Sequence, residues 1–265
     1  MKSNVANQIF LYLNKPIKNK EMFVRRFVEK IPYFEDVGYA GYIGEDELKR
    51  FLLWSIYGQQ SETSWEEINQ QEIKSVIKDT LEICRPVINH SIRIFVFPTV
   101  NKFTKQKMGG VAGFTPWKNT IIINLYQTEN IKQRLKETLG HELAHALALN
   151  FNERSTLQDD LVFEGVAEHF RECFIGGGKA EWVNSISKEK AKTILLGIKQ
   201  ELSNRNDILY KELFFESNKY PLWAGYAVGY YLVESYLEKL NKKDWKEIIK
   251  TQPSKIMKRN SFLDQ

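Results

Sequence analysis

Residues 138–150 read TLGHELAHALALN, and His141, Glu142 and His145 stand in a stretch that is otherwise mostly apolar. Residues four apart lie on one face of an α-helix, so both imidazoles can point at one place. Glu142 is rotated by about 100° from His141 and should lie beside that place. A helix that is apolar nearly all round is buried, and buried polar side chains need partners. The pattern predicts a buried helix with two histidine ligands for a metal ion and with Glu142 as the base that activates water.

The apolar residues along the rest of the chain predict an α+β fold, mostly helical, with a small sheet next to the HELAH helix. Three stretches between residues 91 and 127 are rich in β-branched and aromatic residues and predict about three strands: SIRIFVFPT, GGVAGFTP and NTIIINLY. Residues 1–90 place apolar residues at helical intervals, in NQIFLYLNK (7–15) and in three later segments. The glycine-rich stretch GYAGYIG (38–44) is expected to break this helical region.

Helical periodicity resumes at residue 130. Besides the HELAH helix, the segments expected to be helical are about 156–174, 182–203 and 222–240. We therefore expect two domains: a helical N-terminal region (1–90) and a second domain (91–265), in which the sheet (91–127) precedes the active-site and following helices (128–265).

The composition is that of a soluble globular protein, with 43% hydrophobic and 27% charged residues among 265. The net charge of +5 is spread along the chain, so no nucleic-acid partner is expected. No uninterrupted apolar stretch approaches 18 residues, so no membrane partner is expected. The first residues lack the apolar core of a secretion signal, and Cys84 and Cys173 are too few for a disulfide framework. These features favour a cytoplasmic protein with reduced thiols; they do not indicate an oligomeric state.

A catalytic zinc ion needs a third protein ligand and an open position for water. The helix expected after HELAH contains VFEGVAEHF, in which Glu164 follows His145 after 18 intervening residues. Glu168 stands four residues further on and shares a helix face with Glu164. His169 is a competing candidate ligand, whereas His90 precedes an expected strand and is interpreted as an ordinary polar residue.

The HExxH motif, followed by a glutamate in an EGxA context, resembles the gluzincin zinc peptidases. This resemblance implies a gluzincin or thermolysin-like core that holds one zinc ion per chain, with Glu164 as the third ligand. It also implies that Glu168 accepts a hydrogen bond from a ligand histidine, which would fix the tautomer of that ring. The alternative for Glu168 is a surface salt bridge with Arg171 or Lys179.

A longer resemblance runs through GGVAGFTP, TIIINL, HELAH, EGVAEHF and WAGYAVGYYLVESYLEK, over about residues 90–240. The stretch is similar to a bacterial family of predicted zinc-dependent proteases, which makes residues 91–265 the expected metallopeptidase domain. It implies hydrolysis of peptide bonds in a peptide or protein substrate. The Gly-x-Met-Glu-Asn strand of M1-type aminopeptidases is missing, which favours an endopeptidase.

Two tyrosines are candidate donors to the oxyanion that forms during peptide hydrolysis, since gluzincins supply a tyrosine or histidine for this task. Tyr226 is the first choice and Tyr230 the second, because both lie on one helix face in GYAVGY. The alternative is that both are core aromatic residues. Similarly, GGVAGFTP is either a strand edge that holds an extended substrate or a plain hairpin.

Two rival functions remain open at this stage. In the first, zinc has a purely structural role and links two helices. Structural sites usually have four protein ligands, however, and Cys173 is too far along its helix from Glu164 to bind the same ion. A catalytically silent zinc-binding or regulatory module on a metallopeptidase scaffold is the second alternative.

Overall fold

The computed structural model describes residues 7–13, 20–28, 45–58, 67–215 and 217–262. The glycine-rich break expected at residues 38–44 lies outside them. The chain divides into two compact units, residues 1–146 and 147–265.

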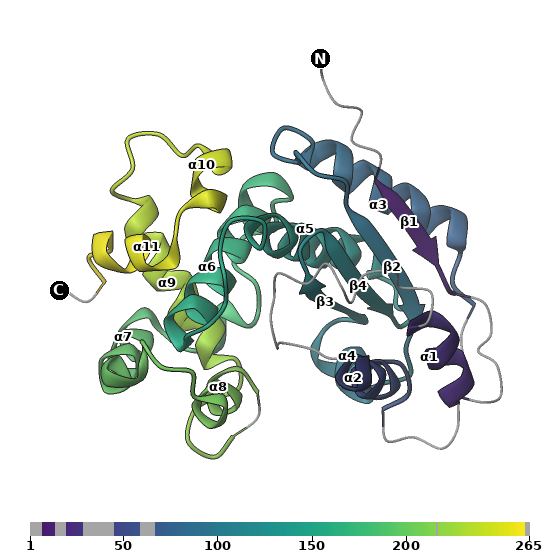
Figure 1. Ribbon diagram of the computed structural model, residues 1–265, viewed down its shortest axis with the longest axis horizontal. Coiled ribbons are helices and arrows are strands. Elements are labelled where there is room, and N and C mark those ends of the chain that lie inside the picture. The colour runs from purple at the N-terminus through teal and green to yellow at the C-terminus, as the bar shows by residue number, and fades with distance from the viewer. Residues whose placement is uncertain (1–6, 14–19, 29–44, 59–66, 216, 263–265) are drawn as a thin grey trace. The chain divides into compact units, whose positions relative to one another are not determined.

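Figure 1 labels the α-helices and strands; the 3₁₀ helices η1 and η2 complete the set of described elements. In chain order they are β1 (Gln8–Leu11), α1 (Lys20–Val28), α2 (Glu45–Tyr57), α3 (Gln70–Cys84), β2 (Arg93–Pro98), α4 (Lys102–Lys107), β3 (Val111–Trp117), β4 (Thr120–Leu125), α5 (Ile131–Ala148), α6 (Leu157–Phe174), η1 (Val183–Ser185), α7 (Lys188–Gly197), η2 (Lys199–Glu201), α8 (Asp207–Phe214), α9 (Ala224–Leu237), α10 (Trp245–Lys250) and α11 (Pro253–Arg259). The predicted α+β class is confirmed: the described residues are mostly helical and include one small mixed sheet. None of the described helices combines the length and apolar character needed to span a membrane.

The first unit is built on a four-stranded sheet with the strand order β1-β2-β4-β3. β1 and β4 both pair with β2 in parallel, whereas β3 pairs with β4 antiparallel and forms an edge of the sheet. The pairing shifts between Phe114 and Trp117, so that Thr115 and Pro116 form a β-bulge. Bulges bend a strand and change the direction of its side chains, and this one lies in the strand that reaches the HELAH helix.

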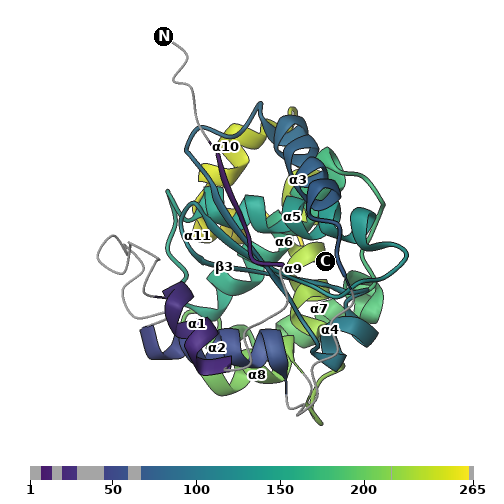
Figure 2. The same ribbon diagram turned by 90° about the vertical axis from the view of Figure 1, so that its right-hand side faces the viewer.

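Helices cover both faces of this sheet. On one face an apolar cluster joins the sheet to α1 and α2; it includes Val24, Val28, Leu48, Leu52, Ile56, Phe95, Phe97 and Ile122. Figures 1 and 2 both show α3 and α5 on the opposite face. Strand residues alternate between faces, so Ile94, Val96, Ile121 and Ile123, all fully buried, point toward these two helices.

Helix α5 carries the HELAH stretch and is buried along its second half. Every residue from 139 to 148 is buried, which confirms the expectation drawn from its apolar sequence. The β3–β4 turn is tied to this helix, because the backbone N–H of Asn119 donates to the carbonyl of Ala146 at 3.2 Å. Asn119 has a φ of 59°, a left-handed conformation that asparagine tolerates in tight turns.

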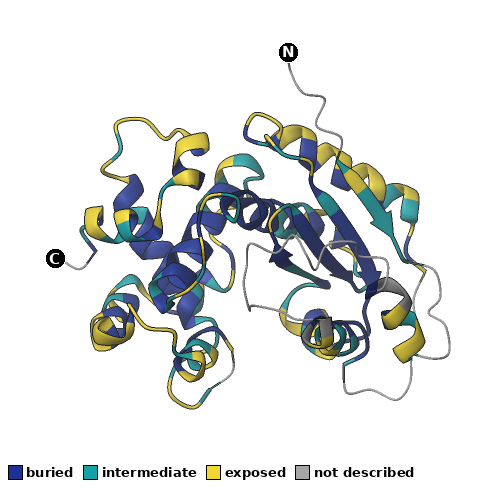
Figure 3. Cartoon of the chain, in the orientation of Figure 1, coloured by how far each residue is buried: buried dark blue, intermediate teal, exposed yellow. Residues whose placement is uncertain are grey.

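The second unit is centred on α6 and α9, which Figure 3 shows as mostly buried. α6 begins with a capping box, in which Thr156 and Asp159 bind each other's backbone N–H groups. Gly165 of α6 and Gly229 of α9 face each other so closely that a Cβ on either would overlap a backbone carbonyl of the other helix. The two glycines therefore let the helix backbones touch.

Two predictions of secondary structure are wrong. The segment NQIFLYLNK, expected to be helical, contains strand β1. A short apolar run such as IFLYL suits a strand as well as a helix, and pairing with β2 decides between them. The continuous helix expected at 182–203 is divided into η1, α7 and η2. Ser187 caps α7 by accepting from the backbone N–H of Lys190, so a new helix starts there. The three predicted strands at 91–127 are confirmed as β2, β3 and β4.

Candidate metal centre

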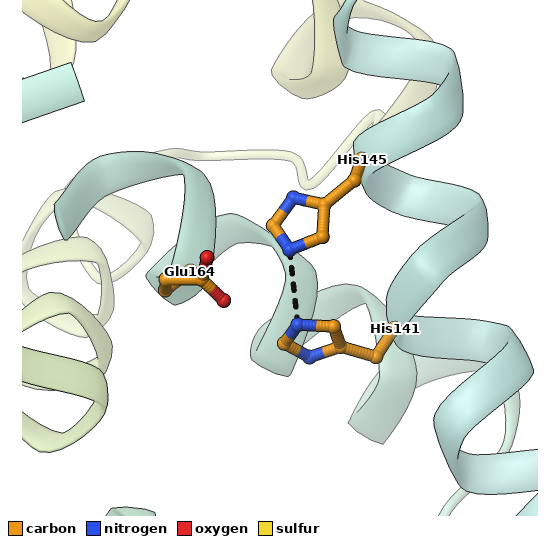
Figure 4. A group of neighbouring side chains, drawn as sticks. All are labelled: His141, His145 and Glu164. Atoms are coloured by element: carbon orange, nitrogen blue, oxygen red, sulfur yellow. Dashed lines mark hydrogen bonds between the residues drawn. The ribbon is translucent and has the colours of Figure 1, made fainter. Parts of the chain in front are cut away.

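His141 and His145 lie one turn apart on α5, and their rings point at each other. The two Nε2 atoms are 3.0 Å apart, and the ring planes are inclined at 79° (Figure 4). Both side chains are buried, with exposed fractions of 7% and 5%. The spacing of four residues along the helix thus brings the two imidazoles to one place, as the sequence predicts.

Glu164, from α6, completes a group of three. Each of the three side chains offers one ligand atom, and these atoms all lie within 4.8 Å of one another. Figure 4 shows the Glu164 carboxylate on the side toward which both imidazoles converge. Among the described residues, this is the one group of three or more histidine, cysteine, aspartate or glutamate residues that could hold a metal ion.

The two histidines fit a zinc ion in their geometry, and the group of three fits it in its chemistry. Two nitrogens that bind one tetrahedral zinc ion at about 2.05 Å lie about 3.3 Å apart, close to the 3.0 Å between the Nε2 atoms of His141 and His145. Two imidazoles and one carboxylate are a common ligand set of catalytic zinc, and three protein ligands leave a fourth position for water or substrate. Binding requires both facing nitrogens to be unprotonated, so the ion would replace the contact between them.

Glu142 is held against the edge strand β3. The hydroxyl of Thr115 donates to its Oε2 at 2.6 Å and also lies 3.2 Å from its backbone carbonyl oxygen. Gly113, two residues earlier in β3, has no side chain at the place where Glu142 packs; a Cβ there would lie 2.5 Å from Cγ of Glu142. Glu142 is 6% exposed. Strand β3 therefore holds the buried carboxylate of Glu142, the residue that directly follows His141 in the sequence.

Glu164 takes part in a network of charges that links α6 to Arg154, in the loop before α6, and to Arg205, in the loop before α8. Nη2 of Arg154 donates to its Oε1 at 3.2 Å, while Nε of the same guanidinium donates to Oδ1 of Asp160 at 2.9 Å. Arg205 donates to the other oxygen of Asp160 at 3.3 Å. Burial raises the pKa of the Asp160 carboxyl, the two arginines lower it and Glu164 raises it further.

The contacts that the structure describes for Glu168 are made within the second unit. Its carboxylate is fully buried and accepts from Nε of Arg171 at 3.1 Å and from Nε1 of Trp182 at 2.6 Å. The alternative prediction for Glu168 is a surface salt bridge with Arg171 or Lys179. A salt bridge with Arg171 is present, but it is buried. A bond from a ligand histidine to Glu168 stays a prediction.

The two candidate tyrosines lie in different surroundings on α9. The hydroxyl of Tyr230 donates to Oε2 of Glu172 at 2.9 Å, and burial, followed by Glu172, raises the pKa of this tyrosine strongly. Tyr226 is partly exposed, and its ring packs near those of Trp182 and Phe214. The hydroxyl of Tyr230 is therefore engaged within the second unit, which leaves Tyr226 as the first choice for an oxyanion donor.

His169 is a packing residue in this structure. Its ring stacks on Tyr230 with 4.0 Å between centroids, and its Nε2 lies 3.1 Å from the carbonyl oxygen of Tyr230, so Nε2 carries the proton. It is not in the group of three, and neither is His90, which lies partly buried in a bend before β2.

His169 should make the protein less stable in acid. Burial lowers the pKa of His169 to about 4, from an ordinary value of 6.5. Between these two values the unfolded chain binds a proton that the folded chain does not, so stability falls as the pH falls. The expected loss is about 3 kcal/mol between pH 7 and pH 4. Urea unfolding at both pH values should show this loss to be smaller in His169→Phe, which keeps the stacking; an equal loss in both proteins would contradict it.

Two residues that contact the proposed site escaped sequence reasoning, Thr115 and Arg154. A signal for the second one exists: Asp160 and Glu164 stand four apart in an apolar helix, and buried acids require a cation. No comparable signal marks Thr115, because its direction depends on how β3 lies along α5.

A histidine pair one turn apart and a glutamate that follows after 18 intervening residues, gathered as one buried group, define the gluzincin type of zinc-metallopeptidase motif. The profile of a family described as "Predicted Zn-dependent protease (DUF2268)" matches residues 70–258, from α3 to α11. The chain therefore belongs to this family of predicted zinc-dependent proteases. Comparison with curated proteins and with solved structures gave no match, so a thermolysin-like core stays a prediction.

Proposed function

We propose that this protein is a zinc metallopeptidase that hydrolyses peptide bonds within a chain, as an endopeptidase. The observation that carries the proposal is the buried group of His141, His145 and Glu164 beside an anchored Glu142. A zinc ion bound there would polarise the carbonyl of the scissile bond and lower the pKa of water. The family match supports the metal and the reaction class, and the missing aminopeptidase strand favours an endopeptidase.

Glu142 acts as the general base in this scheme. Its carboxylate takes a proton from the attacking water and passes it to the leaving amine. Thr115 holds one carboxylate oxygen in place, so the base keeps one orientation throughout. A general base must lie within hydrogen-bonding reach of the proton that it takes, and the next position after the ligand His141 suits this requirement.

The outer edge of β3 is the proposed binding place for an extended peptide or protein substrate. No strand among the described residues pairs with this edge, and Ala112, Gly113 and Phe114 are partly exposed. A peptide can add to such an edge through main-chain hydrogen bonds, and small side chains let it approach. Because Gly113 packs on Glu142, a peptide on this edge would lie near the base.

Tyr226 is the proposed donor to the oxyanion, with Tyr230 as the second choice. Removal of one such donor typically lowers kcat by about 10²–10³. Unchanged kcat in Tyr226→Phe would exclude Tyr226 from the scheme.

Thr115→Val is expected to lower kcat about tenfold or more. Valine keeps the shape of the side chain but removes the hydroxyl that holds Glu142, and a hydrogen bond to a charged group contributes about 1.5–3 kcal/mol. Thr115→Ser keeps the donor and should retain most of the activity, and both variants should bind zinc normally. Steady-state kinetics on one peptide substrate tests this; equal kcat for valine, serine and wild type would show that Thr115 does not position the base.

Removal of the metal tests the proposed function itself. Treatment of the full chain with a strong chelator should lower casein or peptide cleavage at least about 100-fold, and one equivalent of zinc per chain should restore it. Cleavage that survives complete metal removal would overturn the proposal.

The rival to this proposal is a catalytically silent module that binds zinc. It predicts one zinc ion per chain and no cleavage of a peptide library between pH 6 and pH 8. A purely structural zinc site is less favoured, because the group has three ligands and Cys173 is exposed while the group is buried.

A further inference from the structure

Asp160 and Glu164 form a pair of buried acids on one face of α6. They are one turn apart, and their exposed fractions are 0% and 5%. Two like charges at this spacing repel each other, and burial removes the water that would screen them. Such a pair needs a cation within reach to keep both carboxylates charged and in place.

Arg154 supplies that cation from the loop between α5 and α6. Its guanidinium spans the pair, with Nε 2.9 Å from Asp160 and Nη2 3.2 Å from Glu164, and its side chain is only 10% exposed. The guanidinium also lies over the ring of Phe163, 5.4 Å from its centroid. An arginine can bind two acceptors at once because its donors form a rigid planar fork.

The backbone beside Arg154 is fixed by the capping box of α6. Oδ2 of Asp159 accepts from the backbone N–H groups of Ser155 and Thr156, at 3.1 and 2.9 Å. Thr156 in turn caps the helix by accepting from Asp159. The side chain of Arg154 therefore extends from a constrained backbone, and its guanidinium reaches Glu164.

From this arrangement we infer that Arg154 is a positioning residue for the metal ligand Glu164. A carboxylate has two oxygens, so Arg154 can hold one while the other binds a metal ion. Asp160 neutralises the guanidinium, so the arginine adds little net charge that would repel a divalent cation. The inference rests on the proposed function, because it requires Glu164 to bind zinc.

The test is the zinc affinity of the full chain, measured by competition with a chelating dye at pH 7.5. Arg154→Met should weaken zinc binding about 10- to 100-fold, the usual effect of losing a partner that orients a metal ligand. The matched control is Arg205→Met, which removes the other partner of Asp160 and leaves the contact to Glu164 intact. That variant should bind zinc within about threefold of wild type.

Arg154→Lys keeps the positive charge and serves as the test variant if Arg154→Met does not fold. A lysine has a single nitrogen and cannot reproduce the fork, so zinc binding should still weaken several-fold. Affinity equal to wild type in both Arg154 variants, or tighter binding in either, would overturn the inference while the proposed function stands. A wild-type chain that binds no zinc would overturn both.

Discussion

Glu142→Gln is expected to lower kcat by about 10²–10⁴ while the protein still binds one zinc ion. Glutamine has nearly the same shape as glutamate, and its carbonyl oxygen can still accept from Thr115, so the fold around β3 should persist. What it lacks is the ability to take a proton from water. The measurements are steady-state kinetics on a peptide substrate and the zinc content of the same preparation.

The control for this variant is Glu137→Gln, on the same helix. Glu137 pairs with Arg134 and Gln133 and does not contact Thr115 in the described structure, so its loss should leave kcat within about twofold. If Glu142→Gln turned over substrate at the wild-type rate, Glu142 would not be the base. If it lost zinc together with activity, the effect would be structural and the assignment would lack support.

Gly229→Ala is expected to destabilise the second unit by about 3 kcal/mol or more, and to lower its melting temperature by several degrees. A Cβ at Gly229 would overlap the carbonyl oxygen of Leu161 and crowd the backbone N of Gly165. Both obstacles are backbone atoms, so they cannot move aside as a flexible side chain does. α6 and α9 would have to separate, which would loosen much of the buried surface of α6.

Gly197→Ala provides the matched control, because no atom lies within 4 Å of the place where its Cβ would be. Gly197 is the last residue of α7, and alanine is a better helix former than glycine, so the variant should be at least as stable as wild type. Thermal unfolding of both variants measures the difference. A Gly229→Ala protein as stable as Gly197→Ala would show that the two helix backbones are not in contact.

The pairing of His141 with His145 could be predicted from sequence because their relation is local, whereas Glu164 is expected as a ligand from the resemblance to gluzincin peptidases. A spacing of four fixes the direction of two side chains on any helix, and the ring nitrogens indeed lie 3.0 Å apart. Gly165, by contrast, entered the sequence argument only as part of the EGxA pattern. Its physical task, contact with the backbone of α9, depends on Gly229, which lies more than 60 residues further along the chain.

The same distinction explains what was missed in the fold. β1 is short, and its apolar run becomes a strand only through pairing with β2, more than 80 residues away. The helices α4, α8, α10 and α11 have eight residues or fewer, too short for a convincing helical period. The hydrogen bond from Thr115 to Glu142 likewise joins residues 27 apart.

The central claim is that His141, His145 and Glu164 bind one zinc ion, and anomalous diffraction at the zinc absorption edge tests it most directly. A crystal of the full chain grown with zinc should show one strong anomalous peak about 2.0–2.2 Å from both Nε2 atoms and from one carboxylate oxygen of Glu164. No peak at these three side chains, or a peak held by other residues, would contradict the account.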